Sequence, residues 1–206
     1  MDGLELDHLV VCAENLADGV AYVEDLLGVK LAGGGEHVQM GTHNCLLSLG
    51  PSIYLEVITI NPDAPTPDRP RWFDLDRFSG PPRLTNWVVR YDDLNAAIAQ
   101  APAGIGHVMD LARDDLRWKM AVPENGCLPF DGAYPGLIAW GDTPHPAARL
   151  PDQGCRLEML EVFHPDIQQL GGHLETQDIV PARLLDGPTK KLTAHIRAPG
   201  GMRILS

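Results

Sequence analysis

The sequence predicts an α+β fold in which two βαβββ modules follow one another and a small C-terminal appendage, one helix and one β-hairpin, completes the chain. Three observations predict it. A strand-and-helix unit recurs after a fixed interval, several strand-like stretches follow each copy, and a proline-rich segment separates the copies. The expected boundaries are 1–62 for the first module, 63–83 for the connector, 84–166 for the second module and 167–206 for the appendage.

The first unit is a strand followed by a capped helix. A short apolar and β-branched run at 6–11 predicts the strand, Asn15 suits a helix N-cap, and Asp18 stands at the capping-box position. Gly28 suits the left-handed conformation that ends a helix. Between these ends the apolar residues recur at helical spacing, which predicts one buried stripe formed by Leu16, Val20, Val23 and Leu27.

The same order of features returns at 84–89, where a second strand candidate precedes Asp93 as the helix cap. The interval is 78 residues for both features (84 − 6 for the strand, 93 − 15 for the cap). Because the spacing from strand to cap is kept as well as the strand itself, duplication explains the pattern better than chance. His8 of the first copy then has Asn86 as its counterpart in the second.

Short strand-like stretches complete each module, with glycine and proline as punctuation. In the first module they cover 36–41, 42–49 and 52–60. The second module carries an insertion at 123–136, and its stretches cover 106–111, 118–122, 137–140 and 156–163. The appendage is predicted as a helix through 167–172 and a hairpin of 191–198 and 202–205 around a Pro-Gly-Gly turn.

The segment 61–82, which includes most of the connector, contains six prolines and three aromatic residues. The prolines exclude a long helix or a central strand. Leaving Trp72, Phe73 and Phe78 in water would be costly. We therefore expect an ordered segment that covers a core or the mouth of a pocket.

Composition excludes several classes of partner. The 16 basic and 28 acidic side chains give a net charge of −12, which repels nucleic acid and anionic lipid surfaces. The acidic amino terminus does not resemble a signal peptide, and no apolar run reaches the roughly 18 residues of a membrane span, so a cytoplasmic protein is expected. Gly33-Gly34-Gly35 lacks the spacing of a dinucleotide-binding loop.

Several stretches together carry a family resemblance: Asp7-His8, Gly34-Gly35-Glu36-His37, Met40-Gly41-Thr42-His43-Asn44-Cys45-Leu46-Leu47, Tyr54-Leu55-Glu56-Val57, Ile138-Ala139-Trp140-Gly141-Asp142 with His145-Pro146, and Leu160-Glu161-Val162-Phe163-His164-Pro165-Asp166. In these the chain resembles the glyoxalase, bleomycin-resistance and extradiol-dioxygenase superfamily, also called the vicinal oxygen chelate superfamily. Within it, the chain looks like the glyoxalase-like domain proteins of unassigned function. The likeness extends to about residue 166.

The resemblance implies that the two modules curl into a mixed-sheet cup that holds a divalent metal ion or a small molecule. Ligands in this superfamily typically come from the first and last strand of each module. Carried onto this sequence, the metal ligands are His8, Glu56 and Glu161, and the ion is Zn, Fe, Mn, Ni or Co. Asn86 takes the fourth position as a pocket residue, because a neutral amide is a poor ligand for a transition metal.

The chemistry of these residues leaves other roles open. His8 and Glu56 each interrupt an apolar row on one face of a strand, and a carboxylate turned inward needs a cation, a donor or water. A metal ion satisfies Glu56, and so does an arginine such as Arg71, Arg83 or Arg90. His8 also fits a hydrogen-bonded pocket histidine, and Glu161 also fits a salt bridge at the end of a sheet.

Further residues are expected around the pocket. His43 is a candidate general base, since imidazole transfers protons near neutral pH, although the same residue fits a turn cap. Asn44 beside it, Trp140, and His145 between two prolines are expected to contact the substrate. His37 follows two glycines and is expected in an exposed loop.

Three functions are compatible with these features. The first is a metal-dependent lyase, isomerase or dioxygenase that acts on a small oxygenated molecule in the cup. The second is a metal-free protein that binds or sequesters a small molecule, as in bleomycin resistance. The third is an interaction module whose cup is filled by side chains. Module pairing is also compatible with a homodimer.

Overall fold

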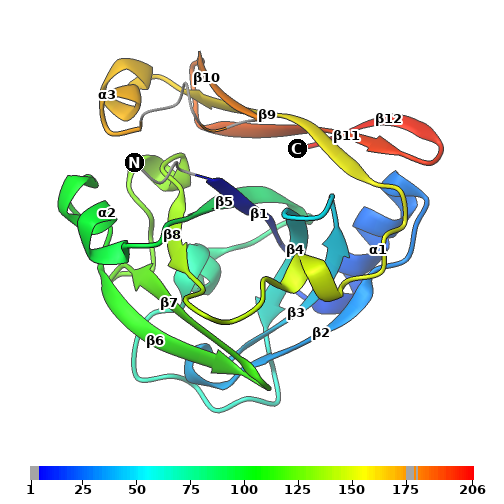
Figure 1. Cartoon of the computed structure of the whole chain (residues 1–206), viewed down its shortest axis with the longest axis horizontal. Coiled ribbons are helices and arrows are strands. Elements are labelled where there is room, and N and C mark those ends of the chain that lie inside the picture. Colours follow the sequence, from blue (N-terminus) through cyan, green and yellow to red (C-terminus); the bar gives the residue numbers. More distant parts are fainter. Residues whose placement is uncertain (1–4, 175–178, 180) are drawn as a thin grey trace.

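The computed structural model describes residues 5–174, 179 and 181–206. Its framework is one eight-stranded sheet built by both modules and one four-stranded sheet built by the C-terminal part (Figure 1). The first module comprises β1 (Glu5–Cys12), α1 (Leu16–Leu27), β2 (Ala32–His37), β3 (Thr42–Ser48) and β4 (Tyr54–Ile60). The second comprises β5 (Arg83–Arg90), α2 (Leu94–Gln100), β6 (His107–Arg113), β7 (Leu116–Val122) and β8 (Gly136–Ala139).

The C-terminal part comprises β9 (Arg156–His164), α3 (Ile167–Gly172), β10 (Ala182–Asp186), β11 (Lys191–Ala198) and β12 (Gly201–Leu205). Short 3-10 helices cover Val38–Met40, Trp72–Arg77, Phe130–Gly132 and Pro146–Arg149. Within the described residues, no helix combines the length and the apolar character needed to cross a bilayer.

The eight-stranded sheet has the symmetry of a duplicated module. Its order is β2-β3-β4-β1-β5-β8-β7-β6, so each strand of one half has a counterpart at the same distance from the centre. The central strands β1 and β5 are antiparallel, whereas the pairs β1–β4 and β5–β8 are parallel. The sheet curls until its edges approach each other (Figure 1): Gln39, just after β2, donates its Nε2 to the carbonyl of Asp110 in β6 at 3.3 Å.

Both α1 and α2 begin at the caps that the sequence predicts, and α1 also ends at the predicted glycine. Asn15 caps α1 by accepting a hydrogen bond from the backbone N–H of Asp18 at 2.9 Å, and Gly28 ends the helix with a left-handed φ of 70°. Asp93 caps α2 in the same way, through the N–H groups of Asn95 and Ala96. The repeated spacing from strand to cap therefore reflects repeated structure.

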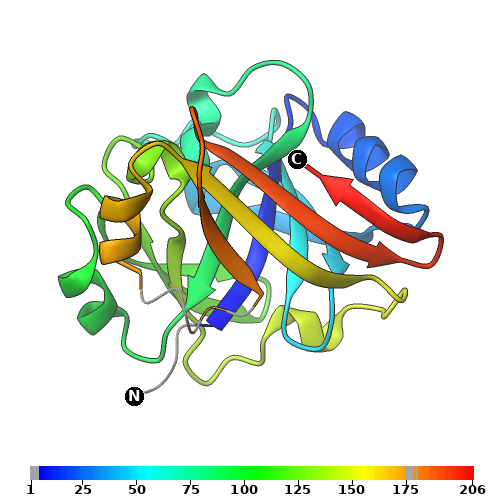
Figure 2. The same ribbon diagram turned by 90° about the horizontal axis from the view of Figure 1, so that it is seen from above.

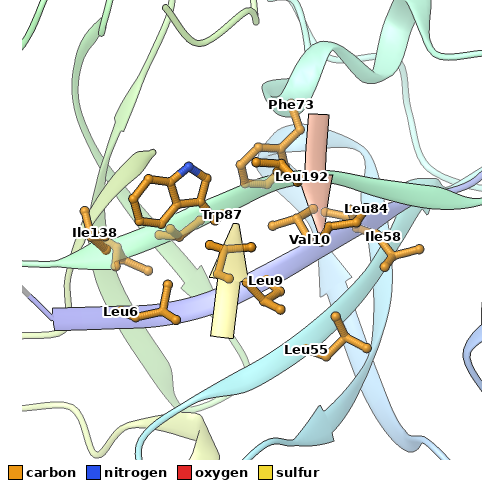
Figure 3. Close-up of a cluster of buried hydrophobic side chains, with 14 of the residues drawn as sticks. Leu6, Leu9, Val10, Leu55, Ile58, Phe73, Leu84, Trp87, Ile138 and Leu192 are labelled. Atoms are coloured by element: carbon orange, nitrogen blue, oxygen red, sulfur yellow. The ribbon is translucent and has the colours of Figure 1, made fainter. Parts of the chain in front are cut away.

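The four-stranded sheet, in the order β10-β9-β11-β12, lies across the curled sheet (Figure 2). Leu9 and Trp87 are paired neighbours on β1 and β5, and regular alternation places them on the face of the sheet opposite to His8. They share one buried cluster with Leu192 of β11 (Figure 3). The appendage is thus a second sheet, in which the predicted hairpin β11–β12 is combined with β9 and β10.

Two strand assignments need correction. The second strand of the first module begins at Ala32, not at Glu36, and so includes the three glycines. The stretch 156–163 does not close the second module, because β9 lies in the four-stranded sheet and β8 takes the closing place. In the first module Val10 pairs with Glu56, and in the second its counterpart Val88 pairs with Gly136. The counterpart of Glu56 is therefore a glycine.

Candidate functional site

The curled sheet encloses a cavity that is aromatic on most sides. Trp72 and Phe73 of the connector line it, whereas Phe78, the third connector aromatic, packs against the hydrophobic core. The other apolar lining comes from β7, β8 and the loop after β8: Leu116, Trp118, Met120, Ile138, Trp140 and Pro146. Its polar lining comes from His8, His37, Asn44, Tyr54, Glu56 and Arg113. The free space is about 390 Å³ with the mouth included, but the centre of a water molecule can reach only about 30 Å³ of it. Such a close-packed site suits a ligand of few atoms.

A bulge in β1 brings two consecutive side chains together. Successive side chains of a regular strand point to opposite faces, so Asp7 and His8 should diverge. The pairing of β1 with β5 shifts between Leu6 and His8, which leaves Asp7 as the extra residue of a β-bulge. As a result the Oδ1 of Asp7 lies 2.6 Å from the Nδ1 of His8.

Asp7 is a fully buried carboxylate surrounded by donors. Its Oδ2 accepts hydrogen bonds from the Nε1 of Trp140 at 2.9 Å and from the Nε2 of His145 at 3.0 Å, and the guanidinium of Arg90 lies 3.8 Å away. Burial alone would raise the pKa of Asp7, but the hydrogen bonds and charges of His145 and His8 outweigh it and hold this pKa well below its usual range. Asp7 is therefore an anion that fixes three side chains.

His8 is held between Asp7 and Glu56. The His8 ring stacks on Tyr54 with centroids 4.5 Å apart and planes 16° from parallel. Its Nδ1 faces Asp7, and its Nε2 lies 3.7 Å from the Oε2 of Glu56. Because Asp7 accepts the proton on Nδ1, the neutral form of the His8 ring has its lone pair on Nε2, which points toward Glu56 and the cavity.

Glu56 is positioned by an amide. The Nδ2 of Asn44 donates to the Oε1 of Glu56 at 2.5 Å, which leaves the Oε2 toward His8. The Oδ1 of Asn44 accepts from the backbone N–H of Gly35 and from the Nη1 of Arg113, both at 2.9 Å. These contacts assign the orientation of the Asn44 amide and satisfy both of its ends.

His37 is buried at the back of the cavity and not exposed as expected. Its Nδ1 lies 3.0 Å from the Oγ1 of Thr42, its Nε2 lies 3.4 Å from the Nδ2 of Asn44, and its ring meets the edge of Trp72. Burial, together with the positive charge of Arg113, lowers the pKa of His37 to about 3. His37 is thus a neutral hydrogen-bonding residue.

Replacing this histidine should change how stability depends on pH. The pKa of His37 is lower in the folded chain than the ordinary 6.5, so only the unfolded chain takes up this proton as the pH falls from 6.5 toward about 3. In this range the His37 imidazole should lower the free energy of unfolding by about 1.4 kcal/mol for each unit by which the pH falls. We expect His37→Gln to remove this part of the slope in urea unfolding, and His107→Gln, an exposed control, to keep it. Parallel curves for the wild type and His37→Gln would contradict the assignment.

The structure brings some of the predicted site residues together and separates others. His8, Glu56, Asn44 and Trp140 line the cavity, and His145 contacts it through Asp7 and lies 5.5 Å from the Tyr54 ring. His43 is absent from the lining, because it alternates with Asn44 along β3 and so faces the other side of the sheet. A role for His43 as the base of this cavity is not compatible with that placement.

Two other predicted residues lie apart from the cavity. Glu161 is on β9 of the second sheet, where it forms an ion pair with Arg183 and lies 3.1 Å from the Nε2 of His195. This is the salt-bridge role that the sequence left open. Asn86 is buried on β5, and its Nδ2 packs against Gly132 of the insertion and not against a ligand site.

A metal centre of three protein ligands does not fit these residues. Catalytic sites of this kind use three His, Cys, Asp or Glu donors that converge on one point. Within residues 5–174, 179 and 181–206, no three such side chains are grouped in this way. Glu161 lies in the other sheet, and the places related to His8 and Glu56 by the duplication hold Asn86 and Gly136. In the part of the chain that the structure describes, no third metal-binding side chain therefore converges with His8 and Glu56.

Comparison with known proteins identifies the family. The model of the glyoxalase-like domain matches residues 6–177. A search of curated proteins found no match. Among solved structures, a hypothetical protein from Staphylococcus aureus is 15% identical with a TM-score of 0.63, over 91% of this chain and 88% of that one. Methylmalonyl-CoA epimerase from Mycobacterium tuberculosis is 18% identical with a TM-score of 0.42, over 69% and 91%.

The match to the family model covers most of the chain, and the duplicated curled sheet is the architecture that the sequence resemblance implied. At 15% identity the match to the Staphylococcus aureus protein supports the fold and leaves the reaction to be argued from the site. The chain therefore belongs to the glyoxalase-like domain family, with the vicinal oxygen chelate fold.

Proposed function

We propose that this protein is an enzyme that moves a proton at the carbon next to a carbonyl group of a small oxygenated molecule. The observation that carries the proposal is the buried Asp7–His8 pair, which turns the Nε2 of His8 toward Glu56 in a close-packed aromatic cavity. An imidazole oriented by a buried carboxylate is a geometry that general-base catalysis uses.

His8 is the base in this proposal. Its Nε2 takes the proton from the carbon, the electron pair of the broken C–H bond moves to the carbonyl oxygen, and an enol or enolate forms. The resulting imidazolium lies between the carboxylates of Asp7 and Glu56, which stabilise its positive charge. Return of the proton to the same or a neighbouring carbon gives exchange or isomerisation without any oxidant. The reaction class is therefore that of an isomerase.

The metal-dependent lyase, isomerase or dioxygenase that the resemblance implied has less support, because the described residues contain no group of three metal-binding side chains. The second candidate is metal-free binding of a small molecule, which the aromatic lining from Trp72, Trp118 and Trp140 favours. In that case the protein would bind its ligand without exchanging its protons. A cytoplasmic location and a homodimer stay predictions.

Solvent exchange tests the proposal. We expect the protein in D2O to exchange the carbon-bound protons next to the carbonyl of pyruvate or a similar small compound, followed by proton NMR. His8→Asn should slow the exchange by about 10²–10⁴-fold, because the general base is removed. His107→Asn, at an exposed histidine, is the control and should leave the rate unchanged.

The same assay with a chelator tests whether the exchange depends on a bound metal ion. Rates before and after treatment with EDTA should agree, and the protein, purified without a nickel column, should hold less than one equivalent of metal. Exchange by His8→Asn at the rate of the wild type would refute the proposal. Binding without exchange would instead select the sequestration function.

A further inference from the structure

We propose that Arg113 binds the carboxylate of the substrate, so that the cup takes a small acid with a carbonyl group beside its carboxylate, such as a 2-oxo acid. This inference rests on the proposed function for the position of the reacting carbon. Arg113 lines the cavity, and none of the described residues forms an ion pair with it.

Arg113 ends β6, the edge strand of the second half of the curled sheet, and its side chain reaches β3 in the first half. There its Nη1 donates to the Oδ1 of Asn44 on β3 at 2.9 Å. None of the ion pairs in the described part of the chain includes Arg113. Arginine has five N–H donors, and this one hydrogen bond uses only one of them. The remaining donors are available to a ligand, and Arg113 lines the cavity.

The glycines of β2 make room for this crossing. The pairing of β2 with β3 shifts between Gly33 and Glu36, so that Gly34 and Gly35 form a bulge opposite Asn44. A Cβ on Gly35 would lie 2.6 Å from the Cδ of Arg113, and a Cβ on Gly34 would lie 2.0 Å from the Oδ1 of Asn44. The glycine run therefore keeps a passage for the arginine into the cup.

The spacing of the polar groups determines the size of the acid. One amide side chain, that of Asn44, connects the guanidinium of Arg113 to the carboxylate of Glu56, with hydrogen bonds of 2.9 and 2.5 Å. An acid of about three carbons spans such a distance, with its carboxylate at Arg113 and its terminal carbon near His8. A guanidinium binds a carboxylate through two parallel hydrogen bonds, which is the recognition proposed here.

Binding of pyruvate and of its uncharged methyl ester tests the inference. The indole N–H signals of the tryptophans in the cavity wall report binding by NMR titration. The wild type should bind pyruvate more tightly than methyl pyruvate. Arg113→Met should weaken pyruvate binding by about tenfold or more and leave binding of the ester unchanged, because only the charge-assisted contact is lost.

Two further variants separate recognition from structure. Arg113→Lys should restore part of the pyruvate affinity, and Arg117→Met, which removes an exposed arginine of β7, should bind as the wild type does. Equal pyruvate affinity of the wild type and Arg113→Met would overturn the inference. Arg113 would then have only a structural role, through its hydrogen bond from β6 to Asn44 on β3. Undetectable pyruvate binding by the wild type would overturn the inference too.

Binding of the carboxylate by Arg113 and proton transfer by His8 can fail independently, and the two assays distinguish these failures. Pyruvate binding that depends on Arg113 without proton exchange would support this inference and refute the catalytic role of His8. Exchange confined to uncharged carbonyl compounds would support the catalytic role of His8 and refute the binding of a substrate carboxylate by Arg113.

Discussion

Asp7→Asn is expected to lower the free energy of unfolding by about 3–5 kcal/mol, the usual cost of removing one charged partner from a buried network. The substitution keeps the shape of the side chain. It replaces an acceptor oxygen by an NH2 group, in a place where the donors of His8, Trp140 and His145 converge. Urea unfolding near neutral pH measures the loss.

A matched substitution separates this effect from a general loss of negative charge. Asp110→Asn removes an exposed carboxylate, 86% accessible, and should change stability by less than about 0.5 kcal/mol. Because the chain carries a net charge of −12, a small gain from reduced repulsion would be common to both variants. Equal unfolding curves for the two variants would contradict the place given to Asp7.

The sign of the pH dependence follows from the lowered pKa of Asp7. In the native chain this carboxylate stays ionised where an unfolded one is protonated, so its stabilisation is present above the ordinary pKa of 3.8 and is lost as the pH falls below it. The difference between the wild type and Asp7→Asn should therefore shrink in acid and stay constant above about pH 5.

Gly34→Ala is expected to lower the free energy of unfolding by about 2–3 kcal/mol, with Gly33→Ala as its control. The added methyl group would lie 2.0 Å from the Oδ1 and 2.2 Å from the backbone oxygen of Asn44. The backbone oxygen cannot yield without opening the pairing of β2 with β3. A methyl group on Gly33 meets no atom within 4 Å. Loss of conformational freedom in the unfolded chain should make that control neutral or slightly stabilising.

The two glycine variants also differ in their effect on the site. When Asn44 is displaced, Glu56 loses the donor that orients it, so the Gly34→Ala protein should lose proton exchange as well as stability. Urea unfolding and the exchange assay are the measurements. If Gly34→Ala is as stable and as active as Gly33→Ala, the packing of Asn44 against the bulge is refuted.

The regular elements could be predicted from the sequence because local chemistry decides them. Asn15 and Gly28 delimit α1 as expected, and the Pro-Gly-Gly turn forms the hairpin of β11 and β12. The start of β2 was missed because Gly33 to Gly35 carry no side-chain pattern, and only pairing with β3 makes them a strand.

The site was predictable only where side chains alternate regularly. His8 and Glu56 interrupt apolar rows, and the structure places them on one face, 3.7 Å apart at their nearest polar atoms. Asp7 was overlooked because a regular strand would turn it away from His8, and a β-bulge has no clear signal in one sequence. Arg113 was overlooked because only the curl of the sheet brings β6 to β3.

Glu161 shows the opposite error. The sequence Leu160-Glu161-Val162 repeats Leu55-Glu56-Val57, and this likeness suggested that both glutamates close a module. Topology decides otherwise, because the insertion at 123–136 precedes β8 and leaves β9 to the second sheet. A short identical motif is weaker evidence than strand order.

Long-range proton–nitrogen NMR of the imidazole rings, recorded at about pH 8 where histidines are ordinarily neutral, tests the orientation of His8 on which the account depends. We predict a proton on the Nδ1 of His8, hydrogen-bonded to Asp7, and an Nε2 without a proton. In Asp7→Asn this preference should be lost. A wild-type His8 that carries its proton on Nε2 would turn no lone pair toward the cavity, and would contradict its role as the base.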